Sequence, residues 1–240
     1  MTVRLNRYLA LCGVASRRRS EEILRSGRVK VGNVIVTDPA MDITEEDQVS
    51  VDGKSVCLQR SVYIVMNKPK GYVCAAEDRF YPTVVGLVSP DLMGKRIYPV
   101  GRLDRQSEGL LVLTNDGDFC NALIHPSAGY QKTYEVLLDR ILTEEELSSW
   151  RKGVPINGRI VSPVSLRVMD RNPAGRWISI VLQEGLKREI RVMASYFSLS
   201  VGVLFRRKIG KMELRKLKSG EYCVVELQRL WRLIRQGGSV

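Results

Sequence analysis

The sequence predicts an α+β protein with a small domain in front of a larger one. Apolar residues with helical and with strand periodicity both occur along the chain, and 44% of its 240 residues are hydrophobic. The stretch 53–61 is typical of a short connector, and a strand pattern begins directly after it. We therefore expect one domain over residues 1–54 and a second over residues 62–240.

The small domain is expected to contain two short helices followed by strands. Apolar residues at helical spacing predict a helix that Gly13 closes, and a second one that Ser16 caps and Gly27 ends. Alternating valines predict a hairpin over residues 29–36 and a further strand at 49–51.

Three arginines, Arg17, Arg18 and Arg19, fall in the first turn of the second predicted helix. Exposed cations there oppose the helix dipole by about 0.3–1 kcal/mol each, so they do not serve stability. The free N–H groups of a helix start and the guanidinium groups both attract phosphate. The arginines therefore indicate a phosphate-binding surface, with an ordinary solvated basic face as the alternative.

The second domain is predicted to open with a strand at 63–66, which ends in a turn at 67–71 that Pro and Gly force. A further strand covers 132–138. Its Tyr134 is either a core residue or a platform on which a base can stack. Residues 236–240 are expected to form a loose tail.

A carboxylate lies in the polar loop that begins the segment 101–118. Asp104 stands between Arg102 and Arg105, and the apolar run at 110–113 predicts a strand buried on both faces. Loops anchored to core strands are where rigid scaffolds hold reactive groups. Asp104 is therefore a candidate reactive group, and a loop salt bridge with either arginine is the alternative.

A third polar segment covers residues 180–193. The pattern predicts a strand that ends at Glu184 and a basic helix behind it that carries Lys187, Arg188 and Arg191. The two arginines are three residues apart and are expected to share a helix face. The alternative is a solvated basic face.

The net charge of +12 indicates a polyanionic partner, although charge alone does not separate nucleic acid from a membrane surface. Residues 1–30 carry a net charge of +6 and residues 185–240 a net charge of +9, so two basic ends flank a nearly neutral middle. No apolar run reaches the ~20 residues of a membrane span. The first residues also lack the apolar core of a signal peptide, so we expect a cytoplasmic protein.

Several site types are disfavoured. The five cysteines are scattered and His125 is the only histidine, so neither a zinc site nor a disulfide framework is expected. The glycine motifs that hold nucleotide phosphates do not occur. An enzyme with this sequence would work with carboxylates, tyrosine and arginine.

Taken together, these segments resemble two known families. The stretch RLNRYLALCGVASRRRSEEILRSGRVKVGNVIV resembles the S-four RNA-binding module. NKPKG, GRLDRQSEGLLVLTNDGD, KTYEV and EGLKREIRVM match in order the motifs of the RsuA-like ribosomal RNA pseudouridine synthases, and RRKIGKMELRKLKSG is similar to their closing segment. The resemblance implies a helix–helix–strand RNA-binding domain followed by a catalytic domain with a mixed, largely antiparallel sheet.

The resemblance also implies a function: an isomerase that converts a uridine of ribosomal RNA to pseudouridine without metal or organic cofactor. In this family Asp104 matches the catalytic aspartate, Tyr134 the tyrosine that stacks on uracil, and Arg191 the basic partner of the aspartate. Attack of Asp104 on the sugar C1′ and its action as a base both stay open. The residues expected to contact RNA are Arg17, Arg18, Arg19, Arg102, Arg105, Lys187 and Arg188.

The sequence leaves the target and two rival functions open. SEGLLVLTNDG favours large-subunit RNA, with small-subunit RNA as the alternative. The rivals are a non-catalytic RNA-binding or ribosome-assembly protein and a glycosidase in which Glu108 is the second carboxylate. We expect a monomer, and no protein partner is implied.

Overall fold

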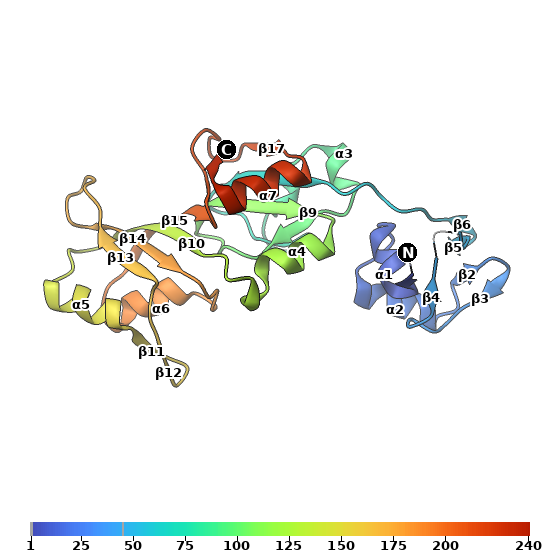
Figure 1. Cartoon of the computed structure of the whole chain (residues 1–240), viewed down its shortest axis with the longest axis horizontal. Helices are drawn as coiled ribbons and strands as arrows, with labels where there is room; N and C mark the ends of the chain where they lie inside the picture. Colours follow the sequence, from blue (N-terminus) through green and yellow to red (C-terminus); the bar gives the residue numbers. More distant parts are fainter. Residues whose placement is uncertain (1, 45) are drawn as a thin grey trace. The chain divides into compact units, whose positions relative to one another are not determined.

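The computed structural model describes residues 2–44 and 46–240 and divides into two compact units (Figure 1). The first unit comprises residues 1–61 and 94–96, and the second comprises residues 62–93 and 97–240. None of the helices in the described part of the chain has the length and apolar character that crossing a membrane requires.

The first unit packs two helices against small antiparallel sheets around an apolar core. Both predicted helices are confirmed, and the Ser16 hydroxyl accepts a hydrogen bond from the Arg19 N–H, as expected of a cap. The connector predicted at 53–61 is wrong in part, because Lys54–Ser55 pair with the preceding strand. The elements are β1 (Val3–Arg4), α1 (Leu5–Leu11), α2 (Arg17–Arg25), β2 (Val29–Val31), β3 (Val34–Ile35), β4 (Asp42–Ile43), β5 (Val49–Val51) and β6 (Lys54–Ser55).

A mixed, largely antiparallel sheet forms the second unit, as the resemblance implied. Its main strand order is β13-β14-β10-β15-β9-β7-β17, and β8, β16 and β18 pair off this path. The strands are β7 (Tyr63–Lys68), β8 (Tyr98–Val100), β9 (Glu108–Thr114), β10 (Lys132–Leu138), β13 (Ser165–Val168), β14 (Trp177–Leu182), β15 (Val201–Ile209), β16 (Met212–Glu213), β17 (Tyr222–Val224) and β18 (Gly238–Ser239), and β11 (Val154–Ile156) and β12 (Arg159–Val161) form a separate hairpin.

Helices cover the sheet and bury its apolar residues. The apolar side chains of β10 and β14 form one cluster with those of α5 and α6. A second cluster contains apolar side chains of β7, β9, α4 and α7. The helices are η1 (Val85–Leu87), α3 (Pro90–Met93), α4 (Gly117–Ile124), η2 (Pro126–Ala128), α5 (Glu144–Lys152), α6 (Glu189–Tyr196) and α7 (Leu227–Gln236).

The prediction that residues 110–113 are buried on both faces is confirmed. Leu110 and Val112 belong to one apolar cluster, and Leu111 and Leu113 belong to another. All four side chains are fully buried, so β9 is a fixed element of the core.

The end of the described chain is ordered, so the loose tail predicted at 236–240 is wrong. Gly238–Ser239 form β18, which pairs with β16. The Val240 N–H donates to the Glu213 carbonyl at 3.0 Å, and the Val240 carbonyl accepts from Arg215 N–H at 2.7 Å. These backbone bonds and the buried Val240 side chain outweigh the flexibility that the glycines suggest.

Strand β9 changes neighbours along its length. Its C-terminal part pairs with β8, whereas Glu108 and Gly109 pair in parallel with Phe205 and Arg206 of β15. At this junction Gly109 has φ +105°, and a Cβ there would lie 2.4 Å from the Arg206 carbonyl oxygen. A side chain at position 109 is therefore incompatible with the two strands being this close.

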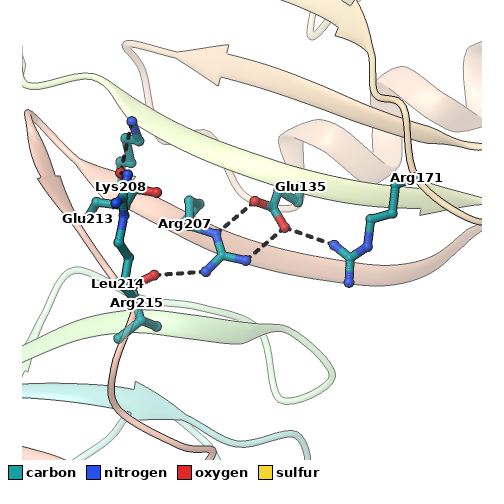
Figure 2. Close-up of polar contacts among 7 residues, drawn as sticks. All are labelled: Glu135, Arg171, Arg207, Lys208, Glu213, Leu214 and Arg215. Carbon is teal, nitrogen blue, oxygen red and sulfur yellow. Dashed lines mark hydrogen bonds and ion pairs between the residues drawn. The ribbon is translucent and has the colours of Figure 1, made fainter. Parts of the chain in front are cut away.

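A charged cluster around Glu135 lies on the face of β10 opposite to Tyr134 and Val136 (Figure 2). The Glu135 carboxylate accepts from Arg207 Nε at 2.7 Å and from Arg171 Nη1 at 3.0 Å. Arg207 also donates to the Leu214 carbonyl at 2.7 Å. The hydrogen bond that Arg207 donates to the Glu135 carboxylate raises the pKa of the Arg207 guanidinium. These bonds tie β10 and β15 to the chain segments on either side of them.

We expect Gly109→Ala to lower the free energy of unfolding by at least about 1–3 kcal/mol, because it adds a left-handed non-glycine residue and a clash with backbone atoms. Gly202→Ala in β15 is the matched control, since its Cβ would meet only the Leu137 carbonyl oxygen, at an ordinary 3.6 Å. Chemical denaturation of both variants measures the difference. Equal stabilities would contradict the close approach at Gly109.

Candidate active site

Asp104 lies in the loop between β8 and β9, one-third exposed, with its carboxylate near two arginines. Its Oδ2 is 3.8 Å from Arg188 Nη1 and 3.9 Å from Arg191 Nε. The arginines that flank Asp104 in sequence are exposed and make no ion pair with it that the structure records, so the partners of this carboxylate come from a distant part of the chain.

Backbone contacts fix the Asp104 loop. The Ser107 N–H donates to the Asp104 carbonyl at 2.9 Å, and the Gly71 N–H donates to the Arg105 carbonyl at 2.8 Å. The Leu103 N–H also donates to the Cys74 sulfur at 3.3 Å. The loop is therefore held both by itself and by the segment that follows β7.

A buried lysine contributes more to this restraint. Lys68, at the end of β7, is fully buried, and its Nζ donates to the carbonyl oxygens of Pro69 at 3.0 Å, Arg105 at 3.4 Å and Ser107 at 2.6 Å. Burial lowers the pKa of the Lys68 ammonium. Three carbonyl dipoles satisfy its three donors, which a buried ammonium requires. Lys68 was not among the residues predicted from the sequence, although its place in NKPKG was a usable signal.

The two arginines near Asp104 differ in freedom. Arg191 is 16% exposed in its side chain, and its Nη1 donates to the Val201 carbonyl at 3.0 Å. Burial lowers the pKa of Arg191, and the nearby Arg188 lowers it further. The Arg188 side chain is 54% exposed. Arg191 is therefore the fixed partner of Asp104, and Arg188 is the accessible one.

The expected helix in the third segment begins later than predicted. Helix α6 starts at Glu189, and Lys187 lies in the turn before it. Arg188 has φ +55°, a left-handed conformation that no α-helix contains, so it cannot share a helix face with Arg191. Both arginines nevertheless lie near Asp104. The sequence-based separation of Arg188, for RNA, from Arg191, for Asp104, is thus not matched by the geometry.

Tyr134 lies on β10 and packs, half-buried, against the apolar cluster that contains α6 residues. The register places it opposite Arg206 of β15, which itself lies opposite Gly109 of β9. Arg206 is buried, and its Nε donates to the Leu110 carbonyl at 2.7 Å. Tyr134 is not among the polar contacts of Asp104, but the same junction positions β10, which carries Tyr134, and β9, into which the Asp104 loop leads.

The remaining residues expected to contact RNA are exposed. In the small unit they open α2, and Arg19 forms an ion pair with Glu22 there. Within the described part of the chain, no group of three or more His, Cys, Asp or Glu side chains is placed to hold a metal ion. The exposed residues of this set are Arg17, Arg18, Arg19, Arg102, Arg105 and Lys187.

Comparison with protein-family models finds two matches. The model described as RNA pseudouridylate synthase matches residues 62–196, and the S4 domain model matches residues 3–56. The first covers more than half of the chain and includes Asp104, Tyr134 and Arg191. The second covers the arginines at the start of α2.

Curated relatives and a solved structure match over nearly the full length. The chain is 34% identical to ribosomal large subunit pseudouridine synthase B of Bacillus subtilis (strain 168), over 98% of each chain. It is 32% identical to the dual-specificity RNA pseudouridine synthase RluF of Escherichia coli (strain K12), over 99% of this chain and 81% of that one. A crystal structure of a pseudouridylate synthase superposes with a TM-score of 0.69 and 27% identity, over 96% of this chain and 99% of that one.

We expect Lys68→Met to loosen the Asp104 loop, because each hydrogen bond from a charged donor contributes about 1.5–3 kcal/mol. Hydrogen exchange at the Gly71 and Ser107 amides should become roughly 10- to 100-fold faster. Lys132→Met is the matched control, since Lys132 is a half-buried lysine of β10 with a carbonyl partner in Gln183. Unchanged exchange in Lys68→Met would show that the lysine does not restrain the loop.

Proposed function

Because the chain belongs to the RNA pseudouridylate synthase family, we propose that it isomerises a uridine of ribosomal RNA and that Asp104 is its catalytic carboxylate. The observation that carries this proposal is the Asp104 loop: a carboxylate on a tightly restrained backbone with two guanidinium groups within 4 Å of one oxygen. A site of this kind holds a reactive group in a defined position before substrate arrives.

Large-subunit RNA is the substrate that we propose. The B. subtilis relative, which the chain matches over almost its whole length, carries that substrate in its name. The E. coli relative is named as having dual specificity. We propose that residues outside the Asp104 loop select the uridine. We propose that the protein acts on this RNA in the cytoplasm and as a monomer.

The reaction requires no group donor, because uridine and pseudouridine are isomers. The N1–C1′ bond breaks, the uracil rotates, and C5 bonds to C1′, while the proton on C5 leaves and N1 gains one. Asp104 would either attack C1′ or remove a sugar proton to give a glycal-type intermediate. In both routes Asp104 reacts as a carboxylate, and the guanidinium groups of Arg188 and Arg191 lie within 4 Å of its Oδ2.

We assign supporting roles to three further residues. Arg191, held by the Val201 carbonyl, would keep the Asp104 carboxylate oriented through the reaction. Tyr134 would stack against the uracil, since its ring is half-buried and its strand is fixed to β15. Arg188 would be shared between Asp104 and an RNA phosphate, because its side chain is exposed.

Flipping a uridine out of its stack costs a few kcal/mol, so the enzyme must bind the surrounding RNA well. The exposed Arg102, Arg105 and Lys187 would contact the RNA backbone around the catalytic loop. In the small unit, the arginines that open α2 place side-chain cations at a helix N-terminus, and the S4 match supports RNA binding by this unit.

We expect the purified protein to form pseudouridine in deproteinised large-subunit RNA, and Asp104→Asn to reduce the rate by at least about 100-fold with nearly unchanged RNA affinity. Glu108→Gln, which neutralises a carboxylate four residues away at the start of β9, is the matched control and should remain active. Chemical mapping of pseudouridine, in vitro and in cells with and without the protein, measures both.

The outcomes separate the alternatives. Pseudouridine in small-subunit RNA alone would correct the substrate and leave the chemistry in place. Release of free uracil would indicate a glycosidase, and complex formation without any product would indicate a binding protein. Turnover by Asp104→Ala would exclude Asp104 as the catalytic carboxylate.

We expect Arg191→Met to slow single-turnover pseudouridine formation at saturating enzyme, and Arg191→Lys to retain more of the rate because it keeps the charge. A lysine loses the planar fork that contacts Asp104 and the Val201 carbonyl together, so it should not restore full activity. Arg188→Met should chiefly raise the enzyme concentration needed for half-maximal rate. The reverse result, with Arg188→Met defective in the chemical step and Arg191→Met only in binding, would exchange the two roles.

A further inference from the structure

The loop between β7 and η1 lies against the Asp104 loop. Leu103 N–H donates to the Cys74 sulfur at one point, and the Arg105 guanidinium lies over the Tyr81 ring, 4.2 Å from its centroid, at another. The base of the loop is closed by hydrogen bonds from Val73 N–H to the Pro82 carbonyl and from Val84 N–H to the Val73 carbonyl, both at 3.0 Å. Residues 74–81 therefore form a projection beside the catalytic carboxylate.

The tip of this projection presents an aromatic side chain to solvent. Phe80 is 83% exposed, the highest value among the large apolar residues that the structure describes. Its backbone is not free: the Asp78 carboxylate accepts from the N–H groups of Phe80 and Tyr81, each at 2.9 Å. A fixed backbone lowers the entropy cost of using the ring in binding.

Phe80 makes no contribution to the core that would explain its place, since most of its ring is in water. Exposed cations lie both in the loop after β7, which carries Phe80, and in the neighbouring Asp104 loop. Surfaces that bind nucleic acid combine cations with aromatic rings in this way. The acidic residues of the projection are Glu77 and Asp78, and Asp78 is used in the turn. The exposed cations are Lys70, Arg79, Arg102 and Arg105.

We propose that Phe80 stacks on a nucleobase next to the flipped uridine and thereby positions the RNA at Asp104. The inference rests on the proposed function, because it requires RNA at the Asp104 loop. Every base has a planar face, so a stacking contact tolerates differences in the RNA sequence. One face of the Tyr81 ring is covered by the Arg105 guanidinium, and this contact attaches the projection to the Asp104 loop. The exposed Phe80 ring is therefore the one available for stacking on a base.

The test uses the full chain and short RNA hairpins that carry the mapped uridine, with 2-aminopurine at each flanking position in turn. Phe80→Ala should raise the enzyme concentration for half-maximal single-turnover rate roughly 5- to 150-fold, with the rate at saturation little changed. Phe80→Trp should restore binding because it is planar. Phe80→Leu, which is apolar but not planar, should behave like Phe80→Ala.

Stacking also has a direct spectroscopic signature. Wild type and Phe80→Trp should quench 2-aminopurine at one flanking position, and Phe80→Ala should not. Ile160→Ala is the matched control, since Ile160 is 67% exposed on β12 of the same unit and outside the two loops. All variants should show the unfolding temperature of the wild type.

Wild-type behaviour of Phe80→Ala on isolated RNA would overturn the inference and point to a protein partner for the ring. Wild-type binding by Phe80→Leu would also overturn it, since an apolar contact would then suffice. Neither result affects the proposed isomerisation, which fails when the wild-type protein makes no pseudouridine in any ribosomal RNA.

Discussion

The close approach of Gly109 to the backbone of Arg206 is the constraint on which the catalytic unit depends. It joins two parts of one sheet through a pairing of only two residue pairs. The Asp104 loop leads into β9 on one side of this junction. Tyr134 and Arg191 belong to the other side, on β10 and on the helix that packs over it. The Asp104 carboxylate therefore lies close to Arg191 because β9 and β15 approach each other at Gly109, which has no side chain.

Charged residues stabilise this arrangement both below the site and at its surface. Below the site, the Lys68 ammonium donates its hydrogen bonds to three carbonyl oxygens and not to a carboxylate, and it restrains the loop in this way. At the surface, Asp104 faces two arginines. Arg191 donates from Nη1 to the Val201 carbonyl, whereas the side chain of Arg188 is exposed. On the opposite face of β10 from Tyr134, the Glu135 carboxylate accepts hydrogen bonds from Arg207 and Arg171, which restrain the strand.

Much of this was predictable from sequence, and the misses have physical causes. Apolar patterning identified the buried strand β9 and both helices of the small unit, because burial leaves a periodic trace. The start of α6 was misplaced because the left-handed conformation of Arg188 has no signal in a residue other than glycine. The tail was misjudged because its order comes from backbone bonds to Glu213 and Arg215, which are distant in sequence. Lys68 was missed because no apolar periodicity marks a lysine as buried, and only its place in the motif NKPKG singled it out.

The two neighbouring loops have different freedom to change in evolution. Loop 101–107 is bonded at three of its residues to Lys68, Gly71 and Cys74, so an inserted or deleted residue would displace Asp104. The projection 74–81 is closed at its base, and the backbone of its tip is held within the projection, by hydrogen bonds from Phe80 and Tyr81 to Asp78. Its tip can therefore change length and composition while the carboxylate stays in place. If Phe80 contacts RNA as we propose, related enzymes can alter this contact and still keep the carboxylate in the same position.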